Sequence, residues 1–435
     1  MTISKPKGTV DILPGESEKW ASMEARIRKV CKLYNFKEIR TPIFEAGELF
    51  HRDQNDVSDM VTKETYDFVD RGERAMTLRP EGTAGDARSF IENKLYVDSN
   101  VSKLFYMGPM FRYERAQRGR QRQFHQFGIE ALGSASPYMD AEVIATAVAV
   151  IKEFGLKGIK VKINTIGDEE SRKLYKDVLV NYFKSYEDDL CEDCKNRLYK
   201  NPLRILDCKV DHHKDYFIKA PKISTYLNEE SKNHFNKVLE ALKDMNIDYE
   251  IDENLVRGLD YYTHTVFEIE VDCAELGAQN VICAGGRYNN LIKQLGGPDT
   301  PACGLAFGME RLLFALESEG AKLAQEANSH LFIIAMGEKA IKRSTQILNS
   351  CRMGGLVTEM DYNNKSIKAQ FKLADKNNAL FTAIIGDNEV ETNTINMKNN
   401  EIDQQETISI DDIYDYVLNY LKGRSCRHCG QCKGE

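Results

Sequence analysis

The alternation of apolar and polar positions predicts a mixed first part of the chain and a regular last part. Over residues 16–34, apolar side chains recur at helical spacing, which predicts an amphipathic helix with one buried stripe: Trp20, Met23, Ile27, Val30 and Tyr34. Residues 36–44 are extended. Because Pro42 cannot donate a backbone hydrogen bond, we expect this segment at a sheet edge or an interface.

A long antiparallel hairpin is predicted over residues 103–133. Its parts are extended segments at 104–107 and 111–115, a polar basic loop at 116–121 and a return strand at 122–132. A helix over about 140–154 and an alternating strand at 159–163 follow. From about residue 168 to 248 the pattern changes to short charged helical pieces, which indicates an inserted helical module.

The last third of the chain predicts a separate small α/β domain. Strands at 249–251 and 266–271 and a helix through Met309 and Leu316 precede a linker at 320–329. After the linker, strands are predicted at 331–336, 356–360 and 380–385, with helices between them at 339–353 and 366–377. A final helix is predicted at 411–421. We therefore expect three regions: 1–325, 329–424 and a cysteine-rich tail at 425–435.

Composition narrows the class of protein. The 435 residues are 42% hydrophobic and 29% charged, which is ordinary for a globular protein, and no apolar run is long enough to span a membrane. Residues 1–7 do not form a secretory signal, so the expected compartment is the cytoplasm, where the eleven cysteines stay reduced. The net charge of -8 argues against a nucleic-acid binder unless a basic patch is local.

The two strands of the hairpin carry the first candidates for chemistry. Arg112 and Glu114 project from one face of a strand, where a guanidinium can clamp a phosphate and a carboxylate can accept from an amine. The alternative is a cross-strand ion pair on a solvated hairpin. The two-residue period also places four residues of the return strand on one face: Phe124, Gln126, Gly128 and Glu130. Buried polar groups there need a ligand or a structural network.

Two further segments combine glycine with polar residues. Arg311 lies near the N-terminus of a helix that follows Gly308, which favours an anion site, although an arginine on a solvated face is the alternative. Glu81 and Thr83 flank Gly82 after an extended run, where they can receive an ammonium group. The alternative for Thr83 is a helix cap.

The cysteines include two clusters. A zinc site formed by Cys191, Cys194, Cys208 and His212 has acceptable ligand types and pair spacing, and unligated thiols are the alternative. The tail packs three cysteines and a histidine into residues 426–432, which is compatible with a soft metal or with a flexible, redox-sensitive segment.

These motifs together resemble a known family. Phe111-Arg112-Tyr113-Glu114 and Gly308-Met309-Glu310-Arg311 resemble motifs 2 and 3 of class II aminoacyl-tRNA synthetases, and residues 24–44 resemble motif 1, the dimer element. Residues 8–14, 255–262 and 284–288 are similar to signatures of the histidyl-tRNA synthetase family. The similarity runs from about residue 5 to about residue 422. It implies an α+β fold: a six-to-eight-stranded antiparallel class II sheet flanked by helices, an inserted helical module and a C-terminal α/β anticodon-binding domain.

The resemblance implies a role for each matching position. The histidine-binding residues would be Glu81, Gly82, Thr83, Gln126, Glu130, Tyr261, Tyr262 and Tyr288. The ATP-binding residues would be Arg112 at the α-phosphate, Glu114 at the adenine and Arg311 at the γ-phosphate, with Mg²⁺ on the ATP. Arg257 would lie between the histidine carboxylate and the α-phosphate, so the catalytic pair would be Arg257 and Arg112.

The expected reaction is activation of L-histidine by ATP and transfer to the 3′ end of tRNA(His), carried out by a homodimer that does not bind membranes. The tRNA acceptor end would meet the hairpin loop through Arg115, Gln117, Arg118 and Arg120, although an exposed turn is the alternative. One rival is an inactive paralogue, the histidine-sensing regulatory subunit of ATP phosphoribosyltransferase. The intact arginine motifs and the C-terminal domain argue against it. Another is a class II synthetase for glycine, proline or threonine.

Overall fold

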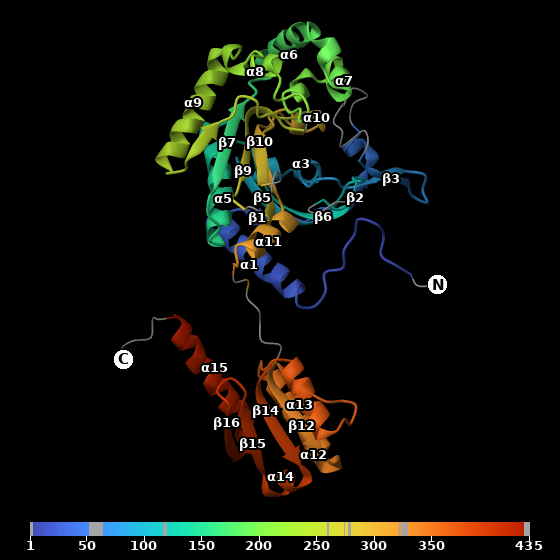
Figure 1. Cartoon of the computed structure of the whole chain (residues 1–435), viewed down its shortest axis with the longest axis vertical. Coiled ribbons are helices and arrows are strands. Elements are labelled where there is room, and N and C mark those ends of the chain that lie inside the picture. The colour runs from blue at the N-terminus through green and yellow to red at the C-terminus, as the bar shows by residue number, and fades with distance from the viewer. Residues whose placement is uncertain are drawn as a thin grey trace. The chain divides into compact units, whose positions relative to one another are not determined.

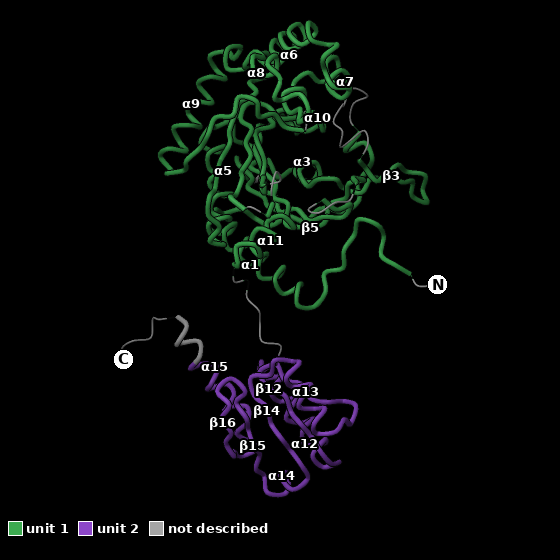
Figure 2. Tube along the Cα trace, viewed as in Figure 1, with its two compact units in different colours: residues 1–323 green, residues 324–435 purple. Residues whose placement is uncertain are grey.

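The computed structural model divides the chain into two compact units, residues 1–323 and 324–435 (Figure 2). It describes residues 3–51, 64–115, 120–258, 261–273, 275–276, 280–321, 323 and 329–429, without the side chains of 98 and 424–429. No helix in these described ranges combines the length and apolar character that crossing a membrane requires.

The centre of unit 1 is an eight-stranded sheet. In spatial order its strands are β1 (Lys37–Glu38), β5 (Ser102–Phe111), β6 (Gln123–Leu132), β11 (Ala302–Gly308), β10 (Val281–Arg287), β9 (Thr263–Glu270), β7 (Lys160–Thr165) and β8 (Tyr249–Ile251). The six inner strands pair antiparallel, as predicted. The outermost strands, β1 and β8, pair parallel with their neighbours, which makes the sheet mixed.

One face of this sheet is covered by four helices: α1 (Ser17–Leu33), α5 (Pro137–Glu153), α9 (Glu229–Asp244) and α11 (Met309–Ser318) (Figure 1). The predicted stripe of the first helix is buried at Trp20, Met23, Ile27 and Val30. Phe127 of β6 and Phe307 of β11 stack in this core at 5.5 Å between ring centroids. Because the apolar core occupies this face, polar side chains of the inner strands are left for the other.

A second, three-stranded sheet stands beside the first. It consists of β2 (Phe44–Ala46), β4 (Ala75–Leu78) and β3 (Tyr66–Val69), with η1 (Gly47–Leu49) after β2 and α3 (Thr83–Glu92) and α4 (Leu95–Asp98) after β4. The single extended segment predicted at 36–44 is therefore wrong. It separates into β1 and β2, which belong to different sheets, and Pro42 lies between them. The proline cannot support a ladder, so the break falls beside it.

The predicted insertion is helical. Its elements are α6 (Glu169–Lys184), η2 (Glu187–Asp189), α7 (Glu192–Lys200), η3 (Pro202–Ile205), α8 (Asp215–Ile218), η4 (Ile223–Thr225) and α9. They gather at one end of unit 1 (Figure 1). Its buried side chains form a core with α3 and with α10 (Leu291–Gln294), and this core includes Tyr175, Leu179 and Phe183. The module thus packs directly against the elements that surround the open face of the sheet.

Unit 2 contains a five-stranded sheet in the order β13 (Thr358–Met360), β12 (Ser329–Met336), β14 (Ala379–Gly386), β15 (Thr394–Asn399) and β16 (Gln404–Ser409). The first three strands are parallel and alternate with α12 (Glu338–Met353) and α13 (Ile367–Lys376), as predicted. The antiparallel pair β15 and β16 and the short α14 (Asp387–Thr392) were not predicted. The last helix, α15 (Ile413–Cys429), follows η6 (Ile410–Asp412) and extends past the predicted end at Leu421.

Candidate active site

The return strand of the hairpin presents alternate residues to the core and to the open face of the sheet. β5 and β6 pair continuously from Ser102 opposite Leu132 to Phe111 opposite Gln123. Phe127 lies in the apolar core, so Gln126 and its two-residue neighbours point the other way. The predicted face of β6 is therefore the face of the candidate site.

The prediction that Arg112 and Glu114 stand in a strand is wrong. β5 ends at Phe111, and the backbone N–H of Glu114 donates to the carbonyl of Arg112 at 2.8 Å, which closes a tight turn. Both side chains still line one cavity, because the Arg112 N–H remains bonded to the Arg122 carbonyl at 2.9 Å, across from the return strand. Their position depends on the turn rather than on strand pleating.

Glu130 marks the buried end of the site and is 1% exposed. Thr83 Oγ1 donates to its Oε1 at 2.6 Å, and the Tyr288 hydroxyl donates to Oε2. Burial raises the pKa of Glu130 well above its ordinary value and the charge of Asp86 raises it further, while the two hydroxyl donors lower it. A buried carboxyl group with a raised pKa favours a ligand that donates a hydrogen bond to it or carries a positive charge.

Two glycines make room for a buried tyrosine that the sequence analysis missed. A Cβ at Gly82 would lie 2.2 Å from the ring of Tyr106, and a Cβ at Gly128 would lie 2.3 Å from it. Tyr106 is 3% exposed. The space beside Gly128 is therefore filled by this ring. A glycine inside a strand of large residues is the signal that could have indicated such a close contact.

The remaining predicted histidine-binding residues lie around this end of the sheet. The Tyr261 hydroxyl donates to Glu81 Oε2 at 2.9 Å, and its ring lies 4.9 Å from that of Tyr262 and 5.5 Å from that of Tyr288. Gln126 is 9% exposed, and its Oε1 is buried without a hydrogen-bond partner among the described residues. A bound ligand would donate the hydrogen bond that this buried oxygen lacks.

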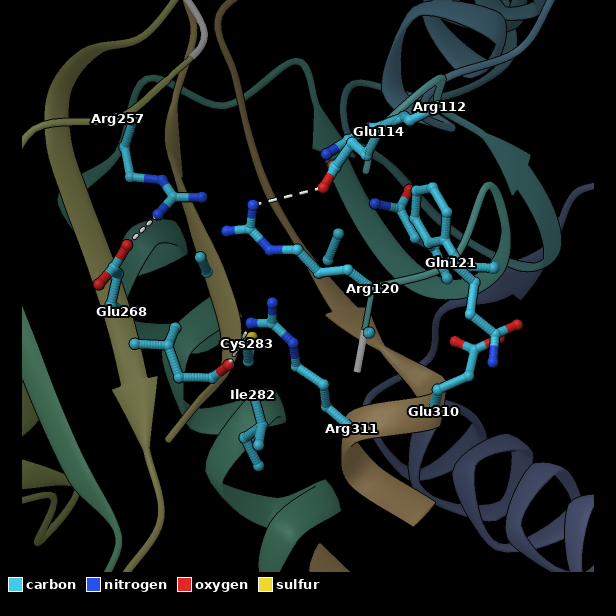
Figure 3. A pocket seen from close by; sticks show the side chains of 16 residues that line it. Arg112, Glu114, Arg120, Gln121, Arg257, Glu268, Ile282, Cys283, Glu310 and Arg311 are labelled. Carbon is cyan, nitrogen blue, oxygen red and sulfur yellow. Dashed lines mark hydrogen bonds and ion pairs between the residues drawn. The ribbon is translucent and has the colours of Figure 1, made fainter. Parts of the chain in front are cut away.

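Beside this region lies a cavity of about 290 Å³ whose lining includes seven charged residues (Figure 3). Its charged lining consists of Arg112, Glu114, Arg120, Arg257, Glu268, Glu310 and Arg311. Figure 3 shows the guanidinium groups of Arg120, Arg257 and Arg311 converging on the space between them. Gln126 also lines the cavity, so the cavity and the Glu130 region share a wall.

Several arginines in the cavity are held in place by acceptors. Arg257 forms an ion pair with Glu268, and Arg120 lies 3.3 Å from Glu114. Arg112 donates through Nε to the Pro80 carbonyl at 3.0 Å. These contacts fix the side chains before any ligand binds, which is the preorganisation that an anion site requires.

Arg311 carries the clearest electrostatic signal. Its Nη1 donates to the Val281 carbonyl at 3.1 Å. Burial lowers the pKa of Arg311, and the charges of Arg120 and Arg112 lower it further. Positive groups that disfavour one another's charge are stabilised when an anion lies between them. The arrangement therefore suits a polyanion such as a chain of phosphates.

Two carboxylates of the cavity were not predicted. Glu268 alternates with the core residues Phe267 and Ile269 on β9, and its charge inside that strand was the available signal. Glu310 accepts from the His125 backbone N–H at 2.8 Å and lies 2.9 Å from His125 Nδ1. Glu310 thus ties β6 to the start of α11, which carries Arg311.

The predicted tRNA-contacting loop is described only at its ends. Arg115 and Arg120 are exposed, and Arg115 lines a shallow open pocket together with Lys7 and Arg122. Gln117 and Arg118 lie outside the described residues. The described part supplies several positive charges on the surface beside the cavity.

The predicted zinc ligands are only partly brought together. Cys191, Cys194 and Cys208 are neighbours, but His212 is exposed and its Nδ1 lies 2.8 Å from the Lys209 carbonyl instead. Asp211 occupies the place predicted for His212. His212, one residue farther along the turn, is exposed, so spacing along the chain did not predict which side chain joins the cysteines. Of the tail cluster, residues 430–435 lie outside the described residues.

Comparison with known proteins agrees with this geometry. A family model described as Histidyl-tRNA synthetase matches residues 8–168 and 207–312, and one described as Anticodon binding domain matches residues 330–420. A histidine–tRNA ligase from Geobacillus sp. is 50% identical over 97% of this chain and 100% of its own length. The enzyme of that name from Bacillus subtilis is 48% identical over 96% of this chain and 99% of its own.

A solved structure extends the similarity to the fold. The apo histidyl-tRNA synthetase of S. aureus is 43% identical, and the alignment covers 96% of this chain and 100% of the other with a TM-score of 0.82. Sequence, domain content and fold agree over nearly the whole length. The chain belongs to the histidyl-tRNA synthetase family.

Proposed function

We propose that this chain is a histidine–tRNA ligase, which activates L-histidine with ATP and transfers it to the 3′ end of tRNA(His). The observation that carries the proposal is the shared wall at Gln126. This residue lines the arginine-rich cavity. Glu130 lies farther along the same face of β6 and accepts hydrogen bonds from the hydroxyls of Thr83 and Tyr288. A phosphate site and a small polar pocket that adjoin in this way can hold ATP and an amino acid in contact.

The polar pocket has the chemistry to recognise histidine. A neutral imidazole has one donor and one acceptor nitrogen. Glu130 supplies the acceptor for the first, and a tyrosine hydroxyl at Tyr262 would supply the donor for the second. Glu81, Thr83 and Gln126 would receive the α-amino group, and Tyr288 and Gly82 would shape the pocket. Because buried polar groups would stay unpaired with an apolar amino acid, we expect discrimination on the order of 10⁴ or more.

The arginines would stabilise the reacting phosphates. The histidine carboxylate attacks the α-phosphorus, a new carboxyl–phosphate bond forms, and pyrophosphate leaves with the electrons of the broken bond. Arg112 would contact the α-phosphate, Arg311 the γ-phosphate and Glu114 the adenine amine. Arg257 would bridge the carboxylate and the α-phosphate. Because both reactants are anions, catalysis consists of charge stabilisation and alignment.

Mg²⁺ would enter with the ATP phosphates. The cavity offers the carboxylate of Glu268, which is a hard oxygen donor of the kind that this ion prefers. When bound, the ion would neutralise part of the charge on the phosphates.

For the second step, a hydroxyl of the terminal nucleotide of the tRNA attacks the activated carbonyl and AMP leaves. We propose that the positive loop around Arg115, Gln117, Arg118 and Arg120 meets the acceptor end, because Arg120, at its described end, lines the cavity. Unit 2, as an anticodon-binding domain, would contact the anticodon. We propose that the protein acts in the cytoplasm, where ATP, free histidine and tRNA are all present.

We propose a homodimer that forms through the second sheet. Phe44 of β2 and Phe68 of β3 are 55% and 42% exposed, and their ring centroids lie 6.4 Å apart. Exposed apolar clusters of this kind are typical of interfaces. Phe68→Glu should shift the sedimentation coefficient from dimer to monomer, whereas Val97→Glu, at an exposed apolar residue of α4, should leave it unchanged. A wild-type monomer would contradict the proposal.

The proposed activity is tested by ATP–pyrophosphate exchange with each amino acid in turn. Exchange with histidine alone is the expected result, and charging of tRNA(His) tests the second step. A folded protein that binds histidine but catalyses no exchange would overturn the proposal in favour of a regulatory paralogue.

A further inference from the structure

The helical module contains a compact group of four metal-ligating side chains outside the candidate active site. Cys191 precedes α7 and Cys194 lies in its first turn, while Cys208 and Asp211 belong to the turn after η3. The sulfur atoms and a carboxylate oxygen of this group all lie within 4.8 Å of one another. Cys194, Cys208 and Asp211 are buried, and Cys191 is half-buried.

The distances match a tetrahedral site. With zinc–sulfur bonds of about 2.3 Å, two thiolates of a tetrahedron are separated by about 3.8 Å. The Sγ atoms of Cys191 and Cys208 are 3.7 Å apart, and Cys208 Sγ lies 3.9 Å from Asp211 Oδ2. Two of the six pair distances therefore stand close to the spacing that a central ion would impose, and none of the six exceeds 4.8 Å.

Backbone donors orient these acceptors. The Asp211 N–H donates to Cys208 Sγ at 3.3 Å, and the Cys191 N–H donates to Asp211 Oδ2 at 2.9 Å. Such donors stabilise negative charge on sulfur and oxygen, which is the form in which both ligate a metal. They also hold the two turns in register, so the four ligand atoms form one cluster.

The pattern in the sequence agrees with a metal site once Asp211 is recognised. Each turn supplies two ligands separated by two residues, Cys191-x-x-Cys194 and Cys208-x-x-Asp211. This is the pairing found in structural zinc sites, in which two short turns clamp one ion.

Charge also favours a divalent ion. Three thiolates and a carboxylate around a divalent ion leave two excess negative charges, and Lys214 Nζ, 2.9 Å from Asp211 Oδ1, offsets one of them. Soft sulfur ligands in a tetrahedral set select zinc over magnesium or calcium. We propose that Cys191, Cys194, Cys208 and Asp211 bind one structural zinc ion. Binding releases the thiol protons to solvent as the zinc–sulfur bonds form.

The cysteine cluster is connected to the candidate active site through Arg204. The segment between the two ligand pairs carries Arg204, whose Nη1 donates to the Gly258 carbonyl at 3.2 Å, beside Arg257. Arg204 and Arg257 also line a common small cavity with Tyr262. Zinc would fix both ends of this segment and so position Arg204 against the loop of Arg257. This consequence rests on the proposed function, whereas zinc binding itself does not.

The test measures zinc in the full-length chain by elemental mass spectrometry after gel filtration. Cys426, Cys429 and Cys432 are first replaced by serine, so that the tail contributes no thiol. We expect one zinc per chain in this background, and loss of that zinc on adding Cys194→Ser or Cys208→Ser. The matched control is Cys351→Ser, a buried thiol of unit 2, which should keep the full zinc content.

A second measurement covers the case in which a cysteine variant fails to fold. Asp211→Asn keeps the size of the side chain, and the cobalt-substituted protein should show thiolate-to-cobalt charge transfer whose spectrum changes in this variant. A folded parent that holds no zinc and gives no such spectrum would overturn the proposal. A Cys191–Cys208 disulfide, detected as two fewer titratable thiols without bound metal, would also overturn it.

Discussion

Arg257 is the residue for which the structure makes the sharpest kinetic prediction. It faces the cavity, is paired with Glu268, and would offset the repulsion that grows as the anionic carboxylate approaches the α-phosphate. Arg257→Ala should therefore lower the rate of histidine-dependent exchange by roughly 10² to 10³ while the KM for histidine changes little. Stopped-flow or exchange kinetics at varied histidine measure both quantities.

The control retains the positive charge and the ion pair. Arg257→Lys should lose less rate than Arg257→Ala, because an ammonium group can still pair with Glu268. It should remain slower than the wild type, because lysine lacks the planar pair of donors with which arginine binds two oxygens at once. Equal losses of rate and histidine affinity in Arg257→Ala would assign this residue to ground-state binding instead.

Glu130 should determine affinity for the amino acid. Both of its oxygens accept from hydroxyls, so the amide nitrogen in Glu130→Gln would face a donor and leave a buried polar group unpaired. At about 1–3 kcal/mol for such a group, the KM for histidine should rise roughly 10- to 100-fold while the KM for ATP stays the same. Glu92→Gln, which alters an exposed carboxylate, is the control. Unchanged histidine kinetics would remove Glu130 from the pocket.

The sequence was sufficient to predict site residues that belong to a local motif. It was not sufficient to predict site residues whose position depends on tertiary contacts. Glu130 stood out as a charge on the apparently buried face of a strand. Tyr106 did not, because only the folded chain brings its ring against Gly82 and Gly128. His212 was expected beside the three cysteines but lies outside their cluster, since the direction of a side chain in an irregular turn does not follow from spacing.

At the scale of elements, the start of α5 is anchored to the sheet by a buried ion pair. Arg287 of β10 is fully buried, and its Nε lies 3.1 Å from both oxygens of Asp140, with His234 3.4 Å from Asp140. Burial alone would raise the pKa of Asp140, but Arg287 and His234 lower it to about 2. Burial, assisted by the charges of His234 and Arg287, lowers the pKa of His264 to about 4.

Stability should consequently fall as the solution is acidified. Between pH 6.5 and 4 the unfolded chain binds a proton at His264 that the folded chain excludes, which costs up to about 3 kcal/mol. Below about pH 3.8 the unfolded chain also protonates Asp140 more readily, so further stability is lost toward pH 2. His264→Asn, which tolerates the φ of +47° at this position, should flatten urea-unfolding free energies between pH 6.5 and 4. The exposed control His213→Asn should keep the wild-type slope. A wild-type slope in His264→Asn would refute this account.

Elements with strong periodicity were predictable, and elements with mixed composition were not. The hairpin was found because both of its strands alternate over many residues. β15 was missed although Ile395 and Met397 are buried, because asparagine and lysine occupy three of its other four positions and have low strand propensity. β1 and β2 were merged because a two-residue edge strand leaves almost no pattern, and its pairing with β5 is decided by the tertiary fold.

For the whole molecule, the division into two units separates the residues proposed for the chemistry from the domain proposed to contact the anticodon. Every candidate residue for histidine and ATP lies in unit 1, which has its own apolar cores. Unit 2 has a separate core around Leu331, Phe381 and Met397 and matches the anticodon-binding model. Since neither core draws side chains from the other unit, removal of unit 2 should not disturb the packing that holds the active site.

A chain that ends at residue 323 should therefore activate histidine but charge tRNA poorly. We expect its exchange rate to stay within about threefold of the full chain, since no atom of the cavity is removed, while kcat/KM for tRNA falls at least about 100-fold, equivalent to about 3 kcal/mol of lost binding. The truncated chain should also remain dimeric if the exposed residues of β2 and β3 form the interface. A chain that ends at Gly423, which lacks only the tail, should retain both activities. Loss of exchange in the shorter chain, with its fold intact by circular dichroism, would show that unit 2 supports the activation step and that the two steps are not separable by unit.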